Sequence, residues 1–336
     1  MMEKMQTEKI LKIRDLEVGF QADQKEVQIL HHVSLDIGYN EVLAVIGETG
    51  CGKSVTGSTI LRILPENAIV RGEILYEEKN ILSMSEEEFR KMRGKEIASV
   101  PQSPSTSLDP LMRVGEQVAE CVTTGNKQSR RAKENVAGRV KEIFHKMKLP
   151  REEEMYGNYP CELSGGMKQR VLLSMGIITS PRLLVVDEPT KAIDWALRKE
   201  VVAQLKELKD EMKCSMLFIT HDLGAAKIIA DRIAVMYCGE VVEMGTTEEV
   251  LYHPNHPYTK GLLASMPSNG MHVMKGYMPS FSENLPPCRF MPRCPEAFEK
   301  CGRQAPHLGL EGHVARCHHC KRKEVRGDAS GNQESQ

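Results

Sequence analysis

Tryptophan, long apolar runs and an excess of charge of either sign are scarce in this sequence of 336 residues. It contains one Trp, and aromatic residues make up 5% of the chain. Apolar residues nowhere continue for about 18 positions, the length that a membrane-spanning helix needs, so we expect no such helix. Lys and Arg total 45 against 46 Asp and Glu, and the formal net charge of −1 gives no overall attraction to nucleic acid or anionic lipid. The composition therefore predicts a folded, soluble protein whose partners must be inferred from local motifs.

An export signal is also lacking. The segment 1–10, MMEKMQTEKI, carries charges and no apolar core, so we expect a protein that is not exported. This expectation bears on the ten cysteines, which would indicate disulfides in a secreted protein. In a reducing compartment, free thiols or metal ligands are the better interpretation.

The hydrophobic pattern indicates an α/β protein. Apolar and polar residues alternate over 10–18 and 28–37, as in two half-buried antiparallel strands. Short apolar runs predict further, buried strands at 42–47, 183–188, 216–221 and 233–237. Helical patterns separate them, so we expect a largely parallel sheet surrounded by helices.

A glycine-rich segment, GETGCGKS at 47–54, fits the pattern of Gly, four residues, Gly, Lys and Ser between a strand and a helix. Such a loop turns backbone N–H groups toward phosphate oxygens, while Lys53 adds a positive charge and Ser54 offers a hydroxyl to Mg²⁺. A chance glycine turn is the alternative. The candidate nucleotide-binding residues are Gly47, Glu48, Thr49, Gly50, Cys51, Gly52, Lys53, Ser54 and Val55.

Two adjacent carboxylates, Asp187 and Glu188, end the apolar run LLVVDE. Neighbouring residues of an extended chain point to opposite sides, so the two carboxylates can have different roles. We expect Asp187 to bind Mg²⁺ and Glu188 to act as the general base that polarises an attacking water. The alternative is that they cap the next helix.

The segment LSGGMKQR at 163–170 resembles the signature of the ATP-binding cassette (ABC) family. Ser164, Gly165 and Gly166 open a predicted helix, whose N-terminus attracts anions. The resemblance implies that this helix end faces the ATP held by a second cassette subunit, so that hydrolysis requires a head-to-tail pair.

Four further positions occur in the family's order. Gln102 resembles the glutamine that senses Mg²⁺ and the attacking water, and the loop after it resembles the region that docks on the membrane subunit. Asp194 resembles the aspartate that communicates across the dimer, and His221 the histidine that contacts the γ-phosphate. Phe20 is a candidate for stacking on adenine, although it could equally be the end of a strand.

The C-terminal part, with HPYTKGLL at 256–263 and a cysteine-rich sequel, resembles the extension on cassette subunits of oligopeptide, dipeptide and nickel importers. In some of those proteins the matching cysteines hold a [4Fe–4S] cluster. The candidate ligands here are Cys288, Cys294, Cys301 and Cys317. Four thiolates also suit zinc, and unliganded thiols are a third interpretation. Cys320, His318 and His319 are spare ligands without an assigned role.

The resemblance implies an ABC-type P-loop NTPase core with an antiparallel β part and a helical part, plus a small cysteine-rich extension. We expect the ATPase domain at 8–252, its helical part at about 105–180, the extension at 253–320 and a disordered tail at 321–336.

The predicted function is ATP hydrolysis that powers peptide import, with ATP and Mg²⁺ as cofactors. The implied partners are a second cassette, either a copy or a paralogue, two membrane permease subunits and, indirectly, an extracytoplasmic solute-binding protein. The chain would lie on the cytoplasmic face of the membrane. A nickel or metal-chelate importer is one alternative and an exporter another. A soluble ATPase that acts on nucleic acid is disfavoured, because the chain lacks a basic patch with aromatics.

Overall fold

The structure is a computed structural model of the chain. It describes residues 8–22, 25–123, 130–191, 195–281, 283, 285–309 and 312–319, except for the side chains of 130–133 and 195–197. Asp194, Cys320 and the tail at 321–336 lie outside the described residues, so the predictions for Asp194 and the tail are not addressed by it.

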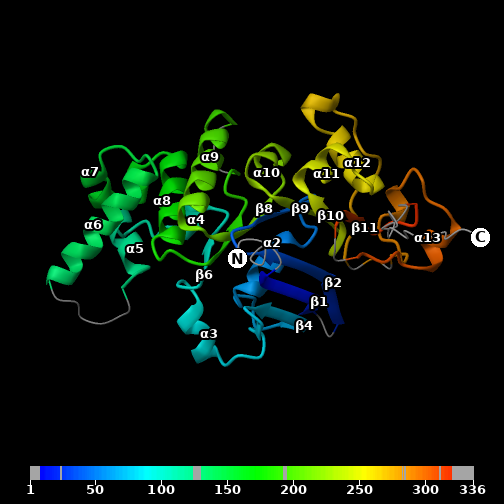
Figure 1. Cartoon of the computed structure of the whole chain (residues 1–336), viewed down its shortest axis with the longest axis horizontal. Coiled ribbons are helices and arrows are strands. Elements are labelled where there is room, and N and C mark those ends of the chain that lie inside the picture. The colour runs from blue at the N-terminus through cyan, green and yellow to red at the C-terminus, as the bar shows by residue number, and fades with distance from the viewer. Residues whose placement is uncertain are drawn as a thin grey trace, which may run out of the picture.

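An antiparallel sheet forms one layer of the molecule (Figure 1). Its order is β2-β1-β4-β5, and its strands are β1 (Lys9–Ala22), β2 (Lys25–Gly38), β4 (Ala68–Tyr76) and β5 (Lys79–Asn80). Buried and exposed side chains alternate along much of β1 and β2, as one buried sheet face requires. The antiparallel pair predicted at 10–18 and 28–37 is therefore confirmed, with both strands longer than the pattern indicated.

A second sheet of seven strands contains the predicted parallel core. Its order is β11-β10-β9-β3-β8-β7-β6. The parallel strands are β9 (Arg232–Tyr237), β3 (Val42–Ile46), β8 (Ser215–Thr220), β7 (Leu183–Asp187) and β6 (Ile97–Val100). Two antiparallel strands, β10 (Glu240–Thr246) and β11 (Val314–Ala315), close one edge. All five residues of β3 are buried, which explains why its sequence shows no alternation.

The helices of residues 104–177 gather at one end of the molecule, and those of the C-terminal part lie at the other (Figure 1). The first group comprises α4 (Pro104–Ser107), α5 (Val114–Glu120), α6 (Arg130–Lys146), α7 (Glu152–Gly157), the 3₁₀ turn η1 (Pro160–Glu162) and α8 (Gly165–Ile177). In α6, Val140, Phe144 and the following Met147 are fully buried. These residues recur at helical spacing and form the buried face of this segment.

The remaining helices border the sheets or belong to the C-terminal part. They are α2 (Lys53–Ile60), α3 (Glu86–Met92), α9 (Trp195–Met212), α10 (Leu223–Ile229), α11 (Thr247–Tyr252), α12 (Pro257–Ala264), α13 (Glu299–Arg303) and the 3₁₀ turns η2 (Pro267–Asn269) and η3 (Met291–Arg293). Between residues 265 and 319, the residues that the structure describes form only short elements.

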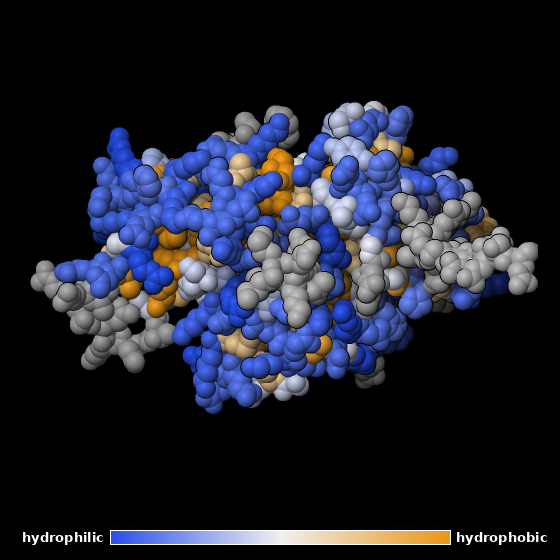
Figure 2. All heavy atoms as spheres, viewed as in Figure 1, coloured by the Kyte–Doolittle hydropathy of each residue, from blue (hydrophilic) through white to orange (hydrophobic). Residues whose placement is uncertain are grey.

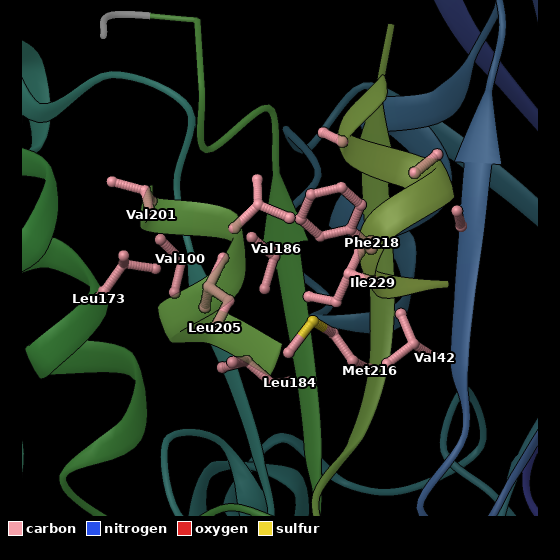
Figure 3. Close-up of a cluster of buried hydrophobic side chains, with 14 of the residues drawn as sticks. Val42, Val100, Leu173, Leu184, Val186, Val201, Leu205, Met216, Phe218 and Ile229 are labelled. Atoms are coloured by element: carbon pink, nitrogen blue, oxygen red, sulfur yellow. The ribbon is translucent and has the colours of Figure 1, made fainter. Parts of the chain in front are cut away.

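Two hydrophobic cores share the strands of the large sheet. Val42 and Ile46 of β3 belong to a core that also contains residues of α8, α9 and α10. Figure 3 shows part of it, with Val186 of β7 next to Phe218 of β8 and Val201 of α9 on the side toward α8. Leu43 of β3 points to the opposite face, where a second core joins the antiparallel sheet. The central strand therefore ties the two layers together.

No helix within the described ranges combines the length and the apolar character needed to cross a bilayer. On the face shown in Figure 2, hydrophilic residues dominate and hydrophobic ones appear in separate small areas.

Candidate functional site

The glycine-rich loop connects β3 to α2 at the carboxyl edge of the large sheet. A side chain at Gly47 would place its Cβ 2.2 Å from the carbonyl oxygen of Met236, so only glycine fits there. Gly52 has a φ of 107°, in the region that favours glycine, and stands at the N-cap of α2. These two glycines let the backbone curl round the start of the helix, as a phosphate-binding loop requires.

Lys53 is folded onto the loop. Its Nζ donates to the carbonyl oxygens of Gly47 and Glu48 at 2.8 and 2.9 Å, and the residue is 4% exposed. Cys51 is buried as well, and burial raises the pKa of its thiol. At neutral pH this cysteine is protonated and serves as packing rather than as a nucleophile. Thr49, Gly50 and Ser54 are exposed, and Val55 is half-buried in the first turn of α2.

Four adjacent parallel strands bring the other predicted residues to the same edge. In the sheet, Ile46 of β3 is level with Thr220 of β8, and Ile219 with Asp187 of β7. Val186 of β7 is level with Val100 of β6. Since parallel strands end at a common edge, the residues that follow each strand must lie near the loop.

Glu188 and His221 are two of these residues, and they form a hydrogen bond between Oε2 and Nδ1. Glu188 is 5% exposed. Its φ of 46° lies in the left-handed region, and its N–H donates to the carbonyl of Ile219 at 2.8 Å. A non-glycine residue held in this conformation costs about 1–3 kcal/mol, which is a common feature of functional sites.

The Ser54 hydroxyl lies close to the Asp187 carboxyl. Burial raises the pKa of the Asp187 carboxyl, and a hydrogen bond from the Ser54 hydroxyl opposes this change. Asp187 Oδ1 is buried and has no hydrogen-bond partner among the residues that the structure describes. A hydroxyl and an unpartnered carboxylate oxygen are the donors that Mg²⁺ prefers, so this pair fits the predicted metal.

Gln102 and Phe20 are less defined. Gln102 follows β6 by two residues and is half-buried. Phe20 belongs to β1, where it pairs with Val27 and Ala68 and packs partly against the second core. Its place in the strand accounts for the apolar side chain, so stacking on adenine stays a prediction.

The signature segment lies at the N-terminus of α8. Ser164 is the N-cap, and its hydroxyl accepts a hydrogen bond from the N–H of Met167 at 3.3 Å. Ser164 and Gly165 are exposed, while Gly166 is half-buried. This helix end therefore presents N–H groups to an outside ligand, and its role toward a second subunit stays a prediction.

Two residues of the C-terminal part contact the loop, and the sequence had not indicated either of them. The Tyr258 hydroxyl accepts a hydrogen bond from the N–H of Glu48 at 3.0 Å. Arg293 Nη1 lies 3.1 and 3.2 Å from the two carboxylate oxygens of Glu48. The HPYT segment resembles the extension of the peptide and nickel importers, but nothing in its spacing points to a contact with a loop 210 residues earlier.

The four candidate cysteine ligands do not form a metal site in this structure. Burial and the nearby thiols of Cys301 and Cys294 raise the pKa of Cys288 to about 11, and burial with Cys317 nearby raises that of Cys294. Within the described part of the chain, no group of three or more His, Cys, Asp or Glu side chains is arranged to hold a metal ion. Ring nitrogens of the spare residues His318 and His319 instead bond to backbone carbonyls at 2.9 Å. The iron–sulfur and zinc predictions thus gain no support from the geometry.

Comparison with known proteins agrees with this fold. The model of the ABC transporter family matches residues 30–191, and that of the oligopeptide/dipeptide transporter C-terminal region matches 242–301. The oligopeptide transport ATP-binding protein OppD of Bacillus subtilis is 42% identical over 77% of this chain and 72% of its own length. The dipeptide transport ATP-binding protein DppD of Lactococcus lactis is 41% identical over 79% and 75%.

A solved ATP-binding cassette, described as a dimer in a post-hydrolysis state with ADP and Pi, has the same fold. Its TM-score is 0.62 at 24% identity, covering 70% of this chain and 98% of that one. The loop, the strand-end carboxylates and the capped signature helix define a P-loop ATPase of the cassette class. The chain belongs to the family of ABC transporter ATP-binding proteins. It is an ATPase whose hydrolysis is coupled to transport.

Proposed function

We propose that this chain hydrolyses ATP to power the import of dipeptides or oligopeptides through separate membrane permease subunits. The observation that carries the ATPase role is the convergence of Lys53, Asp187, Glu188 and His221 at one edge of the sheet. Support for the peptide solute comes from the match of 242–301 to the peptide-transporter C-terminal region and from relatives named for peptides. The nickel and nucleic-acid alternatives are not favoured by these comparisons.

In the proposed mechanism, each residue does what its position allows. Lys53 exchanges its bonds to the loop carbonyls for phosphate oxygens, a change that keeps the ammonium paired. Glu188 accepts a proton from the attacking water, while His221 fixes the orientation of its carboxylate. Gln102 would help to orient the same water and contact Mg²⁺.

Magnesium would be held by Ser54 and Asp187, and when bound it would neutralise charge on the phosphates. The residues fit the ion because they supply hard oxygen donors, one of them unpartnered within the described ranges. Asp187 must be ionised to do so, and its raised pKa means that protons compete for this site at higher pH than for an ordinary aspartate.

We further infer that two cassettes act together, with the α8 N-terminus at Ser164 of one facing the ATP of the other. The exposure of Ser164 and the dimeric form of the solved cassette support this arrangement. Asp194 would communicate between the two sites. Whether the second cassette is a copy or a paralogue does not alter the chemistry.

The permease would dock beside the loop that follows Gln102. An apolar groove borders this loop, and it lies between the large sheet and the helical part. Its lining includes Ile63, Pro101, Ser107, Cys121 and Met175. A groove of this kind suits an apolar helix end of a membrane subunit, which would hold the chain on the cytoplasmic face of the membrane.

Uptake by the assembled transporter tests the proposal. The complex with two permease subunits is placed in vesicles with an extracytoplasmic solute-binding protein, and uptake of a radiolabelled tripeptide is measured with ATP inside the cytoplasmic compartment. We expect uptake that is lost in Glu188→Gln and unaffected by nickel. Uptake of ⁶³Ni²⁺ without peptide uptake would instead favour the nickel importer.

The [4Fe–4S] cluster remains a prediction from resemblance alone. Iron and acid-labile sulfide, measured after anaerobic purification of the full chain, test it directly. Four iron atoms per chain, lost in Cys294→Ser, would support a cluster. One zinc ion per chain would support the zinc alternative, and no metal would support the free thiols of this structure.

A further inference from the structure

The C-terminal part of the chain returns to the phosphate loop and holds its second residue from two directions. Tyr258 accepts the backbone N–H of Glu48, and Arg293 binds both oxygens of its carboxylate. Tyr258 lies 210 residues and Arg293 245 residues after Glu48. A loop that must present N–H groups to phosphate thus has its entry fixed by a distant segment.

Burial makes this contact rigid. The Arg293 side chain is 6% exposed, and its guanidinium lies 5.6 Å over the ring of Tyr237. Tyr237 in turn packs on Tyr258 and Phe290, with ring centroids 4.7 and 5.2 Å apart. Because the guanidinium and the phenol belong to one packed aromatic cluster, they cannot follow Glu48 if the loop moves.

The same segment also lies against the loop farther along. A Cβ built at Gly50 would come within 3.3 Å of the methyl group of Met278. Another link joins the C-terminal part to the core away from the loop: His313 Nε2 lies 2.7 Å from Oε1 of Glu243 on β10. The contact between His313 and Glu243 therefore joins the C-terminal part to the core away from the loop, and it can serve as a control.

We propose that Tyr258 and Arg293 are positioning residues of the nucleotide site: they fix Glu48 and so hold the phosphate loop in its phosphate-binding conformation. They act through Glu48. The proposal rests on ATP binding, which is common to the family, and not on the identity of the solute.

The full chain, titrated with the fluorescent analogue MANT-ATP and Mg²⁺, provides the test. Arg293→Gln removes the charged contact and should raise the Kd by about 3- to 10-fold. Arg293→Lys should recover most of the affinity, because a single nitrogen of Arg293 makes both contacts. Tyr258→Phe keeps the ring and removes the acceptor, so it should also raise the Kd.

His313→Gln is the control, since it cuts a contact between the C-terminal part and the core that does not reach the loop. It should lower the melting temperature without changing the Kd. In the ATPase assay of the assembled transporter, Arg293→Gln and Tyr258→Phe should raise KM more than they lower kcat. This is expected for residues that shape the binding conformation of the loop.

A double-mutant cycle separates a direct effect from a general one. If Arg293 acts through Glu48, the Kd changes of Glu48→Gln and Arg293→Gln will not add in the double variant. Additive effects, an equal loss in His313→Gln, or normal affinity in both Arg293→Gln and Tyr258→Phe would overturn the proposal. Tyr258→Phe keeps the packing of the cluster, so it decides the matter if Arg293→Gln does not fold. Failure of the unsubstituted chain to bind MANT-ATP would count against the ATPase assignment itself.

Discussion

Glu188 Oε2 and His221 Nδ1 are hydrogen-bonded although 33 residues separate them in the sequence. The contact arises because β7 and β8 are neighbouring parallel strands, and each residue directly follows the end of its strand. The imidazole therefore sets the direction of a carboxylate that is itself almost fully buried. This relationship gives the two residues separable roles.

Replacing the proposed base is expected to stop hydrolysis while preserving binding. Glu188→Gln keeps the shape of the side chain but cannot accept a proton, so kcat should fall by at least about 100-fold. MANT-ATP affinity should remain, because the loop and Lys53 are unchanged. Phosphate release and size-exclusion chromatography with ATP check this, the second for a trapped dimer. Normal turnover would show that the base is another group.

Removing the orienting histidine should have a smaller effect. In His221→Ala the carboxylate of Glu188 loses the hydrogen bond to the imidazole, so kcat should fall by about 10- to 100-fold with little change in KM. The matched control is His32→Ala, which removes an exposed histidine paired with Asp15 and Glu17 on the antiparallel sheet. Equal losses in both variants would contradict the proposed role.

Blocking the signature helix should separate binding from catalysis. Ser164→Arg places a long cation at the exposed N-terminus of α8 and removes its cap. The isolated chain should bind MANT-ATP as before, whereas the assembled transporter should lose ATP turnover. Ser164→Thr, which retains a capping hydroxyl, serves as the control for helix stability. Unimpaired turnover in Ser164→Arg would contradict the two-subunit site.

Acid should destabilise the C-terminal part through His256. Burial lowers the pKa of this histidine to about 3, and its Nδ1 accepts the N–H of Tyr258. The unfolded chain binds a proton at His256 near pH 6.5, whereas the folded chain does not. The contribution of His256 to the free energy of unfolding is therefore full above that pH and is lost as the pH falls below it.

Urea unfolding between pH 7 and 5 measures this effect. A single such group contributes a slope that approaches about 1.4 kcal/mol per pH unit well below pH 6.5. His256→Asn can still accept the N–H of Tyr258 but does not titrate, so its stability should fall less on acidification. Parallel curves for the two proteins would place the pH dependence elsewhere.

The strands and the loop could be predicted because their signals are local. The glycine spacing at 47–54 and the apolar run before Asp187 are each complete within about ten residues. Once the alternation of strands and helices indicates a parallel sheet, the shared edge follows from topology, and so does the proximity of Glu188 to His221.

The support of the loop from the C-terminal part could not be predicted in this way. Tyr258 and Arg293 reach Glu48 through tertiary packing of an aromatic cluster. No periodic pattern or motif around either residue indicates that Glu48 is its partner. Strands β10 and β11 were also not anticipated. β10 is buried, yet its sequence EVVEMGT contains two glutamates. An ion pair between Glu240 and Arg316 and a hydrogen bond between Glu243 and His313 make this burial tolerable.

The two-residue strand β11 has an effect out of proportion to its length. Val314 and Ala315 pair with Met244 and Glu243 along the outer margin of β10, and the Arg316 N–H donates to Val242. A protein shortened to end before residue 312 would present that row of N–H and C=O groups to solvent. An exposed edge strand of this kind can pair with strands of other molecules. We therefore expect residues 314–316, which cover the edge of β10, to limit aggregation.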